Sequence, residues 1–241
     1  MSLSFQTFSQ KDITDQLLQD AATLFTDHYG IWGSRSKLCG RRVKLTAKRL
    51  RDQCLPENGD CSYTTAISDG QLVGHAFTCR WDWDGKRVCW VTQLVVHKEH
   101  RGKGIASTLL RLSRAESDNV YGIMSSHPYA FLATAASFGL SIVNTSLDFI
   151  RDHAEGIMKA SPIDYVATAV VAGSLFCKED STGLISGVDT NFLVDHEELL
   201  HALNHVKSFR HWPLGDLPDG HEFLLILPAQ ARQSTSPVSG G

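Results

Sequence analysis

The sequence predicts a mixed α/β (α+β) fold, in which a mostly antiparallel sheet is flanked by helices. Residues 91–110 run from an apolar strand through a glycine-rich turn into a helix. Two Asp-Gly pairs, at 69–70 and 84–85, each separate two strand-like segments, as in β-hairpins. If the second pair is a two-residue turn, Asp82 faces Arg87 across the strands. Amphipathic helical segments precede and follow these strands in the sequence.

The first half of the chain supplies the elements in a clear order. A helix is expected over residues 12–27, where apolar residues recur with helical spacing. The basic segment 29–54 follows, and its second half has the pattern of a short amphipathic helix. Strands are expected at 62–68 and 72–83, before the apolar strand of the glycine-rich segment.

The helix after the glycine-rich turn is expected to continue to about residue 116. A short strand at 120–125 then leads to His127 and Pro128, and a helix at 129–138 ends at Gly139. The order is therefore helix, helix, three antiparallel strands, helix, strand, helix.

The remaining chain has a weaker pattern. We expect helices at 148–159, 163–176 and 196–207, and strands at 191–194 and 222–227.

The domain organisation follows from these elements and from the length of 241 residues, which is enough for one sizeable core. We expect a single domain over residues 1–228, with a core at 12–139 that the last strand at 221–228 completes. Residues from about 142 to 220 are an insertion. The tail at 229–241 has no core-forming pattern and is expected to be disordered.

Composition excludes several classes of protein. The net charge of −3 gives no reason to expect a nucleic-acid partner. No apolar run approaches the roughly 18 residues of a membrane span, so no membrane partner is expected. The first residues lack the basic start and apolar core of a secretory signal, which favours a cytoplasmic location. The six cysteines show no close pairing pattern and are expected to be reduced.

The most informative segment is the glycine turn, residues 101–106, which reads Arg101, Gly102, Lys103, Gly104, Ile105, Ala106. A strand followed by such a turn and a helix start presents backbone N–H groups at a helix N-terminus, where anions are favoured. The dinucleotide fingerprint fails here because Ser107 stands at its third position, and the spacing of a Walker motif is absent. A tight turn that binds nothing, with solvated Arg101 and Lys103, is the alternative.

The Arg-x-x-Gly-x-Ala pattern, together with the preceding Gln-Leu-Val-Val strand, resembles the acyl-CoA-binding motif of the GNAT superfamily of N-acyltransferases. The resemblance covers roughly residues 13–139 and the last strand. It implies a GNAT-like fold in which the motif strand and the next parallel strand separate. It also implies that the pantetheine arm of acetyl-CoA lies in that gap, much like an added strand.

Carried over residue by residue, the resemblance assigns a cosubstrate site. Backbone groups of Leu94, Val95 and Val96 would meet the acyl carbonyl and the pantetheine amides, and the glycine turn would receive the pyrophosphate. The implied function is an N-acetyltransferase that moves acetyl from acetyl-CoA to an amine, which we expect to belong to a small molecule. A lysine or N-terminal protein acetyltransferase, and a non-catalytic CoA-binding sensor, are the alternatives.

The groups that handle protons depart from the family pattern. Positions that hold Glu or His in many members of the family hold Trp90 and Thr92 here, and Ala135 stands where many have a tyrosine. The candidate catalytic residues are Thr92, which could hold a water, and His127 and Tyr129. Thr92 is otherwise a packed strand residue, and His127 otherwise only begins a helix.

Acceptor-binding candidates lie after the first helix, where family members form part of the acceptor pocket. They are His28, Tyr29 and Trp32, which otherwise only close the edge of the core. His221 and Glu222 begin the last strand, and neither alone indicates a role.

No metal is expected. His201 and His205 stand four residues apart, but the segment from His196 does not read H-E-x-x-H, and an amphipathic helix explains the spacing. The sequence does not indicate an oligomeric state.

Overall fold

The computed structural model describes residues 2–229. The expected tail therefore lies outside the described residues, apart from Ala229, whose backbone N–H donates to the Asn119 carbonyl at 2.7 Å.

The described residues form one eight-stranded sheet with the order β1-β2-β3-β4-β5-β8-β7-β6. Neighbouring strands are antiparallel except β4 and β5, which are parallel. The predicted fold class is confirmed. The strands are β1 (Leu3–Ser9), β2 (Asp60–Ser68), β3 (Gln71–Trp83), β4 (Lys86–Val96), β5 (Asp118–Ser125), β6 (Val170–Ala172), β7 (Gly187–Phe192) and β8 (Gly220–Pro228).

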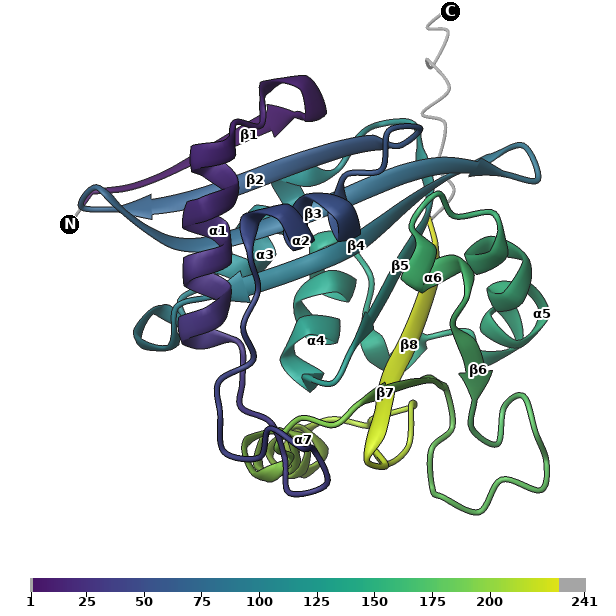
Figure 1. The fold of residues 1–241 in the computed structure, drawn as a ribbon. Coiled ribbons are helices and arrows are strands. Elements are labelled where there is room, and N and C mark those ends of the chain that lie inside the picture. The colour runs from purple at the N-terminus through teal and green to yellow at the C-terminus, as the bar shows by residue number, and fades with distance from the viewer. Residues whose placement is uncertain (1, 230–241) are drawn as a thin grey trace, which may run out of the picture.

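Helices cover both faces of this sheet. In Figure 1, α1 and α2 cross one face of the long strands, and α3 and α4 lie behind the opposite face. Large side chains of the sheet and of these helices are fully buried, including Trp90 of β4, Phe77 of β3 and Phe131 of α4. The helices are α1 (Asp15–His28), α2 (Ala47–Cys54), α3 (Ile105–Ser113), α4 (Pro128–Ser137), α5 (Leu147–Lys159), α6 (Asp164–Ala167) and α7 (Glu197–Phe209). Single 3-10 turns are η1 (Gln10–Asp12), η2 (Lys98–His100) and η3 (Ile142–Asn144).

Both predicted hairpin turns are present. Asp84 and Gly85 have φ values of 47° and 68°, the left-handed pair that a two-residue type I′ turn needs. The predicted register is confirmed, since Asp82 lies opposite Arg87 and accepts a hydrogen bond from its guanidinium at 3.1 Å.

Three expectations about the elements were wrong. Strand β1 was not foreseen, because its residues are mostly exposed and form an edge of the sheet. The helix expected at 163–176 is only the four-residue α6, followed by β6 and a left-handed Gly173 at φ 105°. Helix α3 ends at Ser113 because Arg114 is extended, with ψ 137°.

The segment from 142 to 220 adds strands to the same sheet. Its β7 pairs with β8, and β6 pairs with β7. Strand β8 in turn pairs with β5.

Strands β4 and β5 separate part-way along their length. Their pairing runs from Arg87 and Asp118 to Val91 and Ile123, and then stops although both strands continue. At the same point Thr92 forms a bulge, because Phe77 pairs with Gln93 while Thr78 pairs with Val91. A bulge bends its strand, which fits the departure of β4 from β5 there.

Candidate active site

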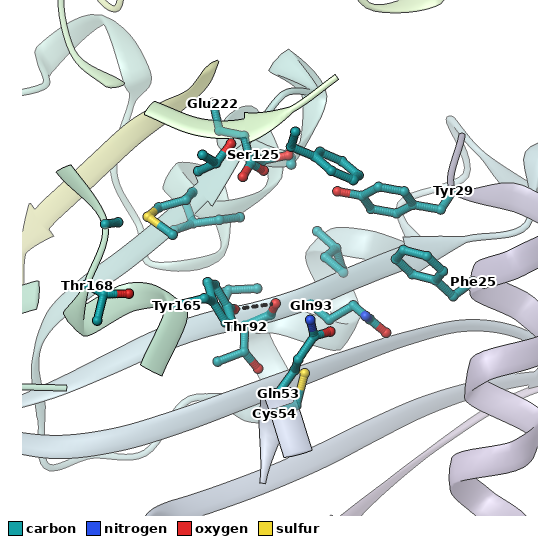
Figure 2. A pocket seen from close by; sticks show the side chains of 18 of the residues that line it. Phe25, Tyr29, Gln53, Cys54, Thr92, Gln93, Ser125, Tyr165, Thr168 and Glu222 are labelled. Carbon is teal, nitrogen blue, oxygen red and sulfur yellow. Dashed lines mark hydrogen bonds between the residues drawn. The ribbon is translucent and has the colours of Figure 1, made fainter. Parts of the chain in front are cut away.

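A cavity of about 410 Å³, called the central cavity below, lies where β4 and β5 separate. Figure 2 shows side chains from both halves of the chain around it. Aromatic rings, amides and hydroxyls make up most of the wall. Its lining residues are Phe25, Tyr29, Gln53, Cys54, Val91, Thr92, Gln93, Leu94, Ile123, Met124, Ser125, Ala130, Tyr165, Thr168, Ala169, Asp189, Thr190, Phe192 and Glu222.

The bulge residue Thr92 connects two parts of this wall. Its backbone carbonyl accepts a hydrogen bond from the Tyr165 hydroxyl at 2.9 Å, drawn as a dashed line in Figure 2. Its own hydroxyl is buried and makes no hydrogen bond of standard geometry within residues 2–229. The Cys54 thiol lies beside that hydroxyl, and burial raises the pKa of this thiol to about 12. Both groups are thus neutral at pH 7.

Glu222 provides a carboxylate in the wall. It lies at the start of β8, opposite Val188 of β7. Burial raises the pKa of Glu222 to about 7, and the Thr190 hydroxyl partly offsets the shift. Among the described residues, no Lys, Arg or His forms an ion pair with it. A carboxyl with a pKa near neutral is suited to accept and release protons at pH 7.

Gln93 is held in one orientation by a buried histidine. His75 Nε2 and Gln93 Oε1 are 2.8 Å apart, and burial lowers the pKa of His75 to about 4. The imidazole is therefore neutral at pH 7, and its Nε2–H donates to the amide oxygen. The Gln93 side chain lines the central cavity, and its amide NH₂ group makes no hydrogen bond within residues 2–229.

The glycine turn lies beyond the outer end of β4. Gly102 and Gly104 have φ values of 74° and 77°, and a Cβ added at either would meet nothing within 4 Å. Within the described chain, the backbone N–H groups of residues 102–107, where α3 begins, donate no hydrogen bond. Lys103 is exposed, Ile105 is buried under the turn and Ala106 is half-buried. The turn thus presents open N–H donors at a helix N-terminus, as an anion site requires.

Arg101 is engaged by the protein itself. Its guanidinium donates to the Val96 carbonyl at 3.2 Å, to the His28 carbonyl at 2.6 Å and to the Glu198 carboxylate of α7. It therefore ties together the ends of α1 and β4 and the start of α7.

His127 and Tyr129 lie at the start of α4 against α7, and neither lines the central cavity. His127 Nδ1 accepts the Tyr129 backbone N–H at 3.3 Å, and its Nε2 lies 3.8 Å from Glu198 Oε1. The Tyr129 hydroxyl lies 2.7 Å from His205 Nδ1. Thr92 is thus separate from the other two candidate catalytic residues.

The three candidate acceptor-binding residues also lie in different places, and one of them reaches the central cavity. Tyr29 lines the central cavity, and Figure 2 shows its hydroxyl directed into it. The His28 ring packs on His97, with centroids 3.8 Å apart, and burial lowers the pKa of His28. Trp32 packs edge-on against Phe192 with centroids 5.3 Å apart, behind the cavity wall.

Comparison with known families decides what kind of module carries this arrangement. The sequence model described as the Acetyltransferase (GNAT) family matches residues 25–125. This segment contains β4, the bulge, the glycine turn and β5 up to Ser125. Residues 25–125 belong to the GNAT acetyltransferase family. The family that this segment matches is one of acetyltransferases.

Solved structures of GNAT proteins show partial likeness. One is a GCN5-related glucosamine N-acetyltransferase region of a fungal multi-domain GH3 β-N-acetylglucosaminidase, with 17% identity, a TM-score of 0.40, and coverage of 53% of this chain and 14% of that chain. The ribosomal-protein-alanine N-acetyltransferase from Brucella melitensis biovar Abortus 2308 has 21% identity, a TM-score of 0.33, and coverage of 46% and 69%. A tandem GNAT protein from the clavulanic acid biosynthesis pathway has 19% identity and a TM-score of 0.41. The match covers 57% of this chain and 43% of that chain. The chain thus spans less than half of the length of the first and third of these. No curated protein sequence matches it.

Glu222 is the wall residue whose setting the sequence did not reveal. The available signal was its spacing, because Glu222, Leu224 and Ile226 alternate along β8 and the latter two are fully buried. An acidic residue in phase with buried apolar neighbours is expected to face the interior.

Two further features concern residues 2–229. No cluster of three or more His, Cys, Asp or Glu side chains in that range is arranged to hold a metal ion. No helix in that range has the length and apolar character of a membrane span.

Proposed function

We propose that this GNAT protein transfers an acetyl group from acetyl-CoA directly to the amine of a small molecule. One observation supports the proposal most: the gap between β4 and β5 has the central cavity at its inner part and the open N–H groups of the glycine turn beyond the outer end of β4. A long thioester with an anionic end and a reactive end matches that arrangement.

In this proposal the pyrophosphate binds the N–H groups of residues 102–106. The pantetheine arm lies along Leu94, Val95 and Val96, on the edge of β4 that does not pair with β5. Because Arg101 is held by Glu198, we assign the phosphate contacts mainly to the backbone and to Lys103.

The chemistry is a direct displacement. A neutral amine in the central cavity attacks the thioester carbonyl, and backbone N–H groups near Val95 stabilise the oxyanion. Loss of one such donor commonly costs on the order of 10²-fold in rate. We propose that Thr92 holds a water at the bulge, and that His127 or Tyr129 supplies the proton for the leaving thiolate.

A small acceptor fits this site better than a protein tail. Residues Tyr165, Thr168 and Ala169, near α6, and residues of β7 form one wall of the cavity. This wall comes from the segment after residue 142 and narrows the space beside β4. The alternatives are a protein acceptor, such as a lysine side chain, and a CoA sensor that transfers nothing. Identification of the acetylated product distinguishes these three outcomes.

Isothermal calorimetry with acetyl-CoA tests the cosubstrate site. Gly104→Ala adds a methyl group to the turn that carries the open N–H groups, whereas Gly85→Ala adds the same methyl group at a similar φ of 68° at the far end of β4. Both substitutions strain the backbone alike. We expect acetyl-CoA to bind at least tenfold more weakly to Gly104→Ala and with unchanged affinity to Gly85→Ala. Equal affinities in the two variants would refute the assignment of the glycine turn.

A further inference from the structure

The walls of the central cavity have an unbalanced charge. Two carboxylates line it, Asp189 and Glu222, and no Lys, Arg or His does so. Asp189 is exposed, and its carboxylate accepts the Asn191 backbone N–H at 3.2 Å. Glu222 is half-buried and lies deeper. A cavity with this charge favours a cation over a neutral or anionic ligand.

The groups around Glu222 come from several elements and are neutral at pH 7, apart from Asp189. Tyr29 follows α1 and Tyr165 lies on α6, and burial, then the Glu222 charge, raises the pKa of Tyr29. Burial raises the pKa of Tyr165 well above its ordinary value, with Glu222 among the contributors. The Thr190 hydroxyl on β7 contacts Glu222, and Cys54 at the end of α2 lies on the opposite wall of the cavity. No positive charge in the wall compensates the carboxylate, so a ligand is the available source of one.

The remaining wall offers apolar contact and neutral hydrogen-bonding groups. Phe25, Tyr29 and Phe192 provide rings, and an ammonium group is also attracted to the faces of such rings. Gln53 and Gln93 provide amides.

We infer that the acceptor is a small primary amine that enters the central cavity as its ammonium form, and that Glu222 binds this group and takes its proton before acetyl transfer. This inference rests on the proposed function. It places the missing general base on β8 rather than on β4, where Trp90 and Thr92 stand.

The step balances without a further reactant. The Glu222 carboxylate takes one proton from the ammonium, and the freed lone pair forms the C–N bond to the acetyl carbon. The C–S bond then breaks, and its electron pair leaves with the CoA thiolate. The second N–H proton is released to water, and Glu222 returns its own proton to water. The thiolate takes its proton from His127 or Tyr129, as proposed above, and that donor regains a proton from water.

The test compares pH profiles of CoA release for the wild type, Glu222→Gln and Glu222→Asp, with an alkylamine of pKa about 10 as acceptor. For the wild type, kcat/KM rises as Glu222 ionises near pH 7. Glu222→Gln is expected to lose 10²- to 10⁴-fold in kcat/KM at pH 7.5 and to recover only as the free amine becomes neutral. Glu222→Asp keeps the rising limb near neutral pH. Glu155→Gln, on the exposed side of α5, is the control for a lost charge and keeps the wild-type profile.

An aryl amine, already neutral at pH 7, provides the second readout. Glu222→Gln is expected to acetylate it within about threefold of the wild-type rate and to bind acetyl-CoA normally. Equal losses with both amines, a wild-type pH profile in Glu222→Gln, or loss of acetyl-CoA affinity in that variant would each overturn the role of Glu222. If the wild type itself releases no CoA with any amine, the proposed function fails and this inference fails with it.

Discussion

The Tyr165 hydroxyl donates a hydrogen bond to the Thr92 backbone carbonyl at 2.9 Å. The contact joins α6, from the segment after residue 142, to the bulge at which β4 departs from β5. The added segment therefore does more than extend the sheet, since it holds the strand that carries the proposed thioester site.

Tyr165→Phe removes this hydrogen bond and keeps the ring. We expect the free energy of unfolding to fall by about 1 kcal/mol, because the carbonyl at the bulge loses its buried donor. Urea denaturation measures the change. An unchanged midpoint and slope would show that the contact contributes nothing to stability.

Glu198→Gln is expected to strengthen CoA binding. The Glu198 carboxylate contacts Arg101, the first residue of the glycine turn, and lies 3.8 Å from His127 Nε2. His127, and then Arg101, lower the pKa of Glu198 to about 2, so it is charged at pH 7. Removal of that charge leaves two basic side chains available to an anion. We expect a Kd about twofold to fivefold lower by calorimetry at low salt, and no such change in Glu197→Gln one residue away. Weaker binding in Glu198→Gln would contradict this view.

Asp118→Asn tests the buried ion pair between Arg80 and Asp118. Arg80 on β3 makes two hydrogen bonds to Asp118 on β5, at 2.8 and 3.1 Å, and both side chains are almost fully buried. A lone buried guanidinium is costly, so we expect a loss of about 3–5 kcal/mol in the free energy of unfolding. Asp60→Asn, which breaks the exposed pair with Arg87, should cost less than about 1 kcal/mol. Comparable losses in the two variants would contradict the assignment.

Glu222→Gln is expected to stabilise the protein at alkaline pH. The pKa of Glu222 is raised in the folded protein to about 7, so the folded state holds a proton that the unfolded state releases near pH 4.3. The wild type therefore loses stability as the pH rises towards and through 7, whereas the amide does not titrate. We expect the variant to be more stable by about 1–3 kcal/mol at pH 8 and equal to the wild type at pH 4.5. Denaturant titrations at the two pH values measure this, and a difference that is independent of pH would refute it.

Short sequence patterns predicted the turns and strands that depend mainly on residues close together in the chain. The Asp-Gly pair at 69–70 sets the turn between β2 and β3, and the pair at 84–85 sets the turn and the register between β3 and β4. Few residues adopt the left-handed conformation that such turns need. The edge strand β1 was missed because its exposed residues do not alternate. The helix expected at 163–176 was wrong because a left-handed glycine and pairing with β7 override the apolar periodicity there.

The site could be predicted only in part for a related reason. The glycine turn and the strand before it are contiguous, so their backbone geometry is readable from the sequence. The central cavity is not, because α2, α6, β7 and β8 bring Cys54, Tyr165, Thr190 and Glu222 together from distant positions. Likewise, the contacts of His127 and Tyr129 with α7 span about 70 residues of sequence.

The most direct test of the account is mass spectrometry of the products formed from acetyl-CoA and a panel of small amines and peptides. We predict an N-acetylated small amine that accumulates in equal amount with free CoA, and no acetylated peptide at a comparable rate. CoA binding without acetylation of any amine would contradict the account.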